Sequence, residues 1–119
     1  MQKDLMDLNK KIAKHLGYSY VPWNNTERMM QGWQRLDAHE SLRPYTYLCK
    51  FHNELNFHCD IRRSELILNY LTDCRYSYTI NHAPEGVTIT ITKPHTEDVV
   101  EFGKNIPEVV FKAFLKIIK

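Results

Sequence analysis

The sequence has little of several features by which classes of protein are recognised. Its 119 residues contain four glycines and five prolines, and no low-complexity linker. No stretch approaches the roughly 20 apolar residues that a membrane helix needs. Residues 1–5 also lack the long apolar run of a secretion signal. We therefore expect a cytoplasmic protein with no membrane segment.

Cysteine and net charge are also low. The three cysteines, Cys49, Cys59 and Cys74, cannot all pair within one chain. Free thiols in a reducing compartment are the simplest interpretation. The net charge is +2, which argues against a strongly basic DNA-binding protein and against an acidic DNA mimic. A content of 43% hydrophobic and 12% aromatic residues is typical of a folded chain, and the length predicts a single domain over residues 1–119.

Apolar residues recur at helical spacing in three segments, which predicts helices over residues 3–16, over residues 61–72 and from about residue 105 to the C-terminus. Gly17 is placed to end the first helix and Asp60 to cap the second. In the second helix we expect Ile61, Leu68 and Leu71 to share one face, which Leu66 and Ile67 widen.

Alternation of apolar and polar residues predicts a β-hairpin, with strands at 76–80 and 87–92 joined by a turn-rich link. Further strands are predicted at 18–20, 32–36, 45–51 and 99–102, of which 32–36 reads as an edge strand with a half-buried Trp33. Because no βαβ rhythm repeats, we predict an α+β fold. It would hold a mostly antiparallel sheet of three to five strands packed with three helices, in an arrangement like an α/β/α sandwich.

The closing helix is more apolar than one buried stripe requires. Asn105 is the candidate cap, and Val110, Ala113, Phe114 and Ile117 form one stripe. An adjacent face then carries Phe111, Leu115 and Ile118. Either the first helix covers this face or a second copy does, which makes a homodimer a possible state.

The helical segments resemble those of a group of phage proteins. Residues 8–18 (LNKKIAKHLGY) resemble its opening helix. Residues 55–61 (LNFHCDI) and 66–71 (LILNYL) resemble its central helix, and residues 105–118 (NIPEVVFKAFLKII) its closing helix. The group consists of small uncharacterised phage-encoded or prophage-encoded proteins of the ABA-sandwich type, in which a sheet lies between helical layers. The resemblance implies a phage or prophage source, and it implies no activity.

Two sets of residues are candidates for binding. The first is aromatic and flanks the weakly patterned region between residues 22 and 44, because tryptophan and tyrosine are common at interfaces. The second is basic and aromatic, and could hold a phosphate or nucleotide by guanidinium forks and ring stacking. The first set is Trp23, Trp33, Tyr45 and Tyr47, and the second is Arg62, Arg63, Arg75 and Tyr76. Ordinary roles in the core or on a solvated helix face remain open for both sets.

Cysteine and histidine offer two further possibilities. Cys49, His52, His58 and Cys59 are zinc-type ligands at a poor spacing, so we predict no metal site. Cys59 is also the one candidate nucleophile, since His58 and a helix start would lower the pKa of its thiol.

No phosphate-binding loop or hydrolase motif is present, and we expect no cofactor and no enzymatic activity. The function expected is that of a non-enzymatic phage or prophage accessory protein in the host cytoplasm. Its partner would be a host protein or complex, and an anti-CRISPR-type counter-defence inhibitor is the sharpest form. The first alternative is a protein that sequesters a nucleotide or small molecule. A zinc-dependent enzyme is the last alternative.

Overall fold

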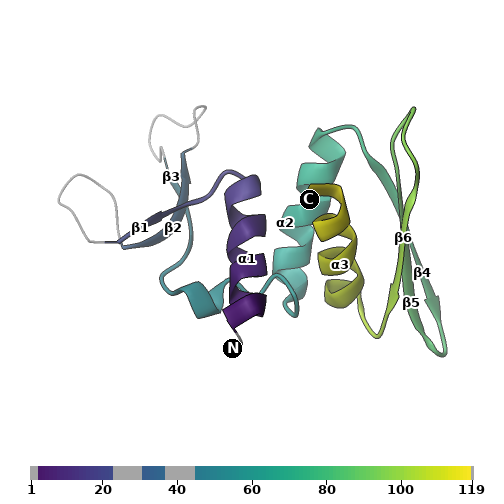
Figure 1. The fold of residues 1–119 in the computed structure, drawn as a ribbon, viewed down its shortest axis with the longest axis horizontal. Coiled ribbons are helices and arrows are strands. Elements are labelled where there is room, and N and C mark those ends of the chain that lie inside the picture. The colour runs from purple at the N-terminus through teal and green to yellow at the C-terminus, as the bar shows by residue number, and fades with distance from the viewer. Residues whose placement is uncertain (1–2, 23–30, 37–44, 119) are drawn as a thin grey trace. The chain divides into compact units, whose positions relative to one another are not determined.

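The computed structural model describes residues 3–22, 31–36 and 45–118 (Figure 1). The chain forms two compact units, Met1–Leu55 and Asn56–Lys119. No helix in the described ranges is long and apolar enough to cross a bilayer. In chain order the elements are α1 (Lys3–His15), β1 (Ser19–Val21), β2 (Gly32–Leu36), β3 (Tyr45–Cys49), the 3₁₀ helix η1 (His52–Glu54), α2 (Ile61–Asp73), β4 (Ser77–Ala83), β5 (Gly86–Thr92), β6 (Val99–Gly103) and α3 (Ile106–Ile118).

Helix α1 ends as its sequence predicts. Gly17 has a φ of +97°, and its N–H donates to the carbonyl of Lys14 at 3.1 Å. The N–H of Tyr18 donates to the carbonyl of Ala13 at 3.0 Å. These two bonds form a Schellman motif, which satisfies carbonyls that the last helical turn leaves free. The chain then turns directly into β1.

The first sheet lies in the first unit and has the strand order β1–β2–β3, with antiparallel pairing throughout. Strand β2 is therefore the middle strand, and the prediction of an edge strand there is wrong. Trp33 pairs with Tyr20 of β1 on one side and with Cys49 of β3 on the other. Its side chain is 1% exposed rather than half-buried, because the indole is a core residue of this unit.

Helix α2 begins where its cap predicts. A carboxylate oxygen of Asp60 accepts from the N–H of Arg62 at 2.9 Å, which satisfies one free donor of the first turn. The buried stripe is centred on Ser64, Ile67 and Leu71. Ile61 is exposed whereas Leu71 is buried, so the prediction that the two share one face is wrong.

The second sheet belongs to the second unit and has the order β4–β5–β6, again antiparallel. The predicted hairpin is confirmed, but its link is only Pro84 and Glu85, because Asn81–Ala83 continues the pairing with β5. Val87, Ile89 and Ile91 of β5 are buried on one face. Helix α3 packs against β5 and β6, and α2 packs against α3.

Helix α3 is capped by Asn105, whose side-chain oxygen accepts from the N–H of Glu108 at 3.0 Å. Val110, Ala113 and Phe114 of the predicted stripe are buried. Phe111 is buried as well, with its ring edge-on to that of His58 at 5.9 Å between centroids. A homodimer through this helix stays a prediction, but Phe111 is buried within its own chain and cannot contribute to the contact.

The α+β class is confirmed, with three helices and antiparallel strands in the described residues. The six strands divide into two sheets of three where we expected one sheet. Each sheet lies within one unit of the chain, β1–β3 in the first and β4–β6 in the second. The single domain over residues 1–119 stays a prediction.

Candidate functional site

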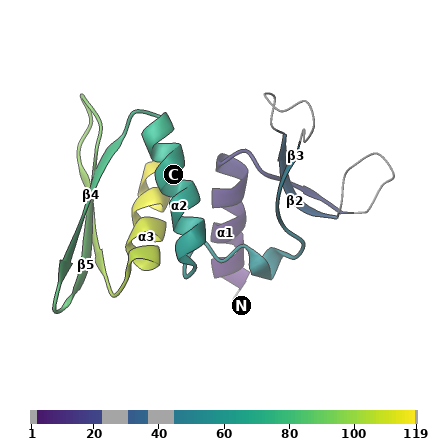
Figure 2. The same ribbon diagram turned by 180° about the vertical axis from the view of Figure 1, so that it is seen from behind.

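The second sheet has one covered and one open face within its own unit. Figures 1 and 2 show α2 and α3 on the same side of this sheet. Because cross-strand partners share a face, the register defines the opposite side. One row there runs from Thr79 through Thr90 to Val100, and the next runs through Thr88 to Phe102. We call this surface the open face, formed by Ser77, Thr79, Asn81, Thr88, Thr90, Val100 and Phe102.

Two large apolar side chains stand on this hydroxyl-rich face. Val100 is 55% exposed and Phe102 is 52% exposed. Both lie on β6, where alternate residues point to opposite faces. Their neighbours Val99 and Glu101 therefore point towards α3. Neighbouring exposed apolar residues on one face are a common mark of a binding surface.

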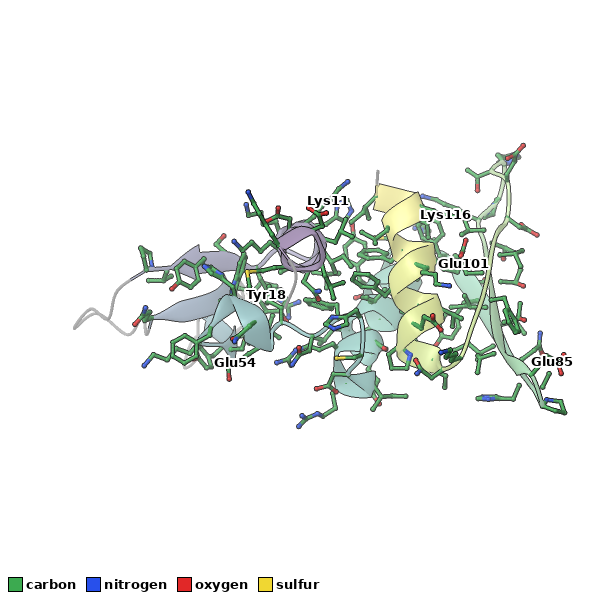
Figure 3. All side chains as sticks on the ribbon, turned by 60° about the horizontal axis from the view of Figure 1, so that its bottom comes forward. Lys11, Tyr18, Glu54, Glu85, Glu101 and Lys116 are labelled. Carbon is green, nitrogen blue, oxygen red and sulfur yellow. The ribbon has the colours of Figure 1, made fainter. Side chains whose placement is uncertain are left out.

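A hollow of about 400 Å³ adjoins the open face at Val100. Its other lining residues are Glu97, Asp98, Val99 and Lys116. Lys116 of α3 forms an ion pair with Glu101 of β6, and Figure 3 shows the two side chains next to each other. Glu97 and Asp98 are exposed, and no ion pair joins either of them to another residue of the described ranges. The hollow therefore presents two carboxylates that can attract a cationic group.

The predicted aromatic set does not form one surface. Trp33 is buried, so its indole cannot contact a partner in this fold. Tyr47 is exposed on β3. Tyr45 lies in β3, but its side chain is outside what the structure describes, and Trp23 lies outside the described residues altogether.

Trp33 instead takes part in an internal aromatic cluster with Tyr20 and His52. Its Nε1–H donates to Nδ1 of His52 at 3.0 Å, so that nitrogen is unprotonated and Nε2 carries the ring proton. The Tyr20 ring lies 4.4 Å from the His52 ring. Burial lowers the pKa of His52 from its ordinary value, and the charges of Lys10 and Lys14 lower it further. The neutral imidazole is therefore part of the folded unit.

The predicted arginine set is divided between the two ends of α2. Arg62 and Arg63 lie in the first turn, whereas Arg75 and Tyr76 follow the last. A 13-residue helix rises by roughly 20 Å, which is too far for the four to hold one phosphate. Arg62 is already paired with Asp60 at 3.3 Å, and the ring of Tyr76 has Lys93 over it at 4.7 Å. That the protein binds a nucleotide stays a prediction, but these four residues do not form the single site that it assumed.

The four predicted zinc-type ligands, Cys49, His52, His58 and Cys59, are not part of a metal-binding group in the described residues. Among the residues that the structure describes, no group of three or more His, Cys, Asp or Glu side chains could hold a metal ion. His52 is engaged with Trp33, and the thiol of Cys49 lies 3.6 Å from the carbonyl of Phe51.

Cys59 does not have the activated thiol that its sequence neighbours predict. Burial raises its pKa, and the negative charge of Asp60 raises it further. The expected lowering is wrong, because burial of the thiol is the larger cause and the charge of Asp60 acts in the same direction. The pKa of His58 is itself lowered by burial, so this imidazole offers no positive charge to the thiol at neutral pH.

Sequence reasoning missed the open face and its hollow. The signal was present in the alternation along β6, which puts Val100 and Phe102 on one face of the sheet and Val99 and Glu101 on the other. Only the position of α3 decides which side is covered. Compared with known proteins, the chain matches no family model, no curated protein and no solved structure.

Proposed function

We propose that this chain is a non-enzymatic accessory protein of phage or prophage origin that binds a host protein through the open face. An anti-CRISPR-type inhibitor acting in the host cytoplasm is the specific form of this proposal. The single observation that carries the binding role is the exposure of Val100 and Phe102 side by side on one strand. The resemblance of the three helical segments to small phage proteins supports the source.

The apolar part of the open face favours a protein partner. Aromatic residues are enriched in the centre of protein interfaces, where they fill pockets of the partner. The backbone of Phe102 is already ordered in the paired strand β6, so little conformational freedom is lost when a partner buries its side chain. The surrounding threonines supply hydroxyl groups that donate to and accept from a partner's polar groups.

The hollow favours a cationic group beside that apolar contact. Glu97 and Asp98 would pair with a lysine or arginine of the partner, while the aliphatic part of that side chain lies on Val100. We therefore expect the host protein to present an apolar pocket with a basic residue at its rim. Such a charge pair contributes more to orientation and association rate than to affinity.

An affinity capture from bacterial host lysate tests this function. Three immobilised baits are compared: wild type, Phe102→Ser, and Phe51→Ser as the matched control. Phe51 is a phenylalanine of the first unit with 53% exposure, almost the same as Phe102. We expect one host protein to be captured by wild type and by the control and to be lost with Phe102→Ser. Equal capture by all three baits would contradict the proposal, provided that circular dichroism shows each bait folded.

A further inference from the structure

Strand β4 is an edge strand of its sheet, and its own residues lack the usual protection. An edge presents unpaired N–H and C=O groups that can pair with another chain, and proteins commonly block it with charge, proline or a bulge. Ser77–Ala83 contains no Asp, Glu, Lys, Arg or Pro. Its pairing with β5 is regular over all seven residues, without a register shift.

The opposite edge of the same sheet is protected. Strand β6 carries Glu101, which is paired with Lys116 of α3. The Nζ of Lys112 also donates to the backbone carbonyl of Phe102 at 3.0 Å. Charged groups of α3 thus occupy the β6 side. The two edges differ, and β4 is the one that can accept a strand.

The inner face of β4 is also incompletely covered. Tyr78 pairs with Ile91 and Ile80 pairs with Ile89, so all four share the face on which α3 packs. Helix α3 covers β5 and β6, and Ile89 and Ile91 are buried. Tyr78 nevertheless stays 40% exposed, because it lies beyond the helix. An additional strand beside β4 would shield it.

We propose that a second copy of this chain adds its β4 to this edge in antiparallel pairing, giving one continuous six-stranded sheet. The strand is complementary to itself when Ile80 opposes Ile80 of the second copy. Tyr78 then opposes His82 of the second copy, an aromatic pair, and Thr79 opposes Asn81, a polar pair. A two-fold axis through Ile80 produces this register, and the contact is isologous and closes at two copies. The inference is independent of the open face and of any host partner.

The association is expected to be weak and concentration-dependent. Pairing of two seven-residue strands buries less than the roughly 1,200 Å² of a stable interface, so we expect a Kd of about 10–100 µM. Sedimentation velocity of the full chain between about 1 and about 500 µM covers this range. Wild type should shift from monomer to dimer across it. A wild type that stays monomeric throughout would overturn the proposal.

Charge exchange at the two-fold position identifies the interface. Ile80→Lys or Ile80→Glu alone places two like charges opposite each other, which opposes pairing. Each variant should be monomeric, whereas their equimolar mixture should again form dimers, because unlike charges then meet. Leu115→Glu is the control, since Leu115 lies on α3, which packs on β5 and β6. Dimers that survive both Ile80 variants, or that only Leu115→Glu disrupts, would place the interface elsewhere.

Amide exchange of wild type gives a second readout that needs no variant. Raising the protein concentration from about 1 to about 500 µM should slow exchange of the outward amides of β4 several-fold. The amides of β6 should not change. Slowing at β6 or α3 in place of β4 would overturn the assignment.

Discussion

The ring of Phe102 lies over Gly86, so closely that a Cβ atom on residue 86 would come within 2.8 Å of the Cζ of the ring. The same Cβ atom would also collide with the backbone carbonyl of Gly103. An aromatic ring that covers a glycine on a neighbouring strand shields the exposed backbone there and is itself held in place. The glycine at the start of β5 thus leaves the room that the ring of Phe102 occupies on the open face.

Gly86→Ala should therefore destabilise the protein. The added methyl group meets backbone as well as the ring, so the strands must shift, and we expect the free energy of unfolding to fall by about 1–3 kcal/mol. Urea denaturation followed by circular dichroism measures this change. Glu85→Ala, at the neighbouring exposed turn position, is the control and should stay within about 0.5 kcal/mol of wild type. Equal stability of Gly86→Ala and wild type would show that the ring does not pack as described.

Acid should weaken the first unit through His52. Its pKa is lowered in the folded protein, so below the ordinary value of 6.5 the unfolded chain binds more protons than the folded one. The stabilisation is complete above that value and is lost as the pH falls from there towards the pKa of the folded state. Protonation of Nδ1 would also remove the hydrogen bond from Trp33. We expect urea midpoints to fall between pH 7.5 and pH 5.

The variant His52→Gln isolates this contribution. A glutamine can accept from Trp33 but does not titrate, so the fall in the urea midpoint should become shallower. It should not vanish, because the pKa of His58 is lowered by burial and acts with the same sign. Asn53→Gln, at the exposed position next to His52, adds no titrating group, is the control and should leave the pH dependence unchanged. An unchanged pH dependence in His52→Gln would contradict the role given to the cluster.

A glycine in place of Arg75, just after the end of α2, should make the protein more stable. Arg75 has a φ of +68°, and its N–H donates to the carbonyl of Thr72 at 3.0 Å. The N–H of Tyr76 donates to the carbonyl of Leu71 at 2.9 Å, which completes a Schellman motif with arginine where glycine is usual. Arg75→Gly should raise the free energy of unfolding by about 0.5–1 kcal/mol. Arg75→Ala keeps the strained backbone, and its thermal midpoint should show no such gain.

The local signals in the sequence were sufficient for the helix ends and the hairpin. Asp60, Asn105 and Gly17 act where they were expected, because capping depends on neighbouring residues within one turn. The strand around Trp33 was also found, but its place in the sheet was not. Whether a strand is at the edge or in the middle depends on partners far along the chain, here Tyr20 and Cys49.

The candidate site depends on the same kind of distant contact. Alternation in β6 shows that Val100 and Phe102 share a face, but it cannot show that α3 packs on the other one. The arginine set failed for a related reason, since Arg62 and Arg75 are close enough in sequence to suggest one patch and are separated by the length of α2. Burial of Trp33 likewise follows from packing within its unit, which composition does not encode.

The binding affinity of the captured host protein for wild type and for Phe102→Ser tests the central claim most directly. Loss of an interface anchor typically costs at least about 2 kcal/mol, so calorimetry should show a Kd raised by about 30-fold or more for Phe102→Ser. Phe51→Ser, with the same chemical change on the first unit, should bind within about two-fold of wild type. An unchanged Kd for Phe102→Ser, or a loss confined to Phe51→Ser, would contradict binding through the open face.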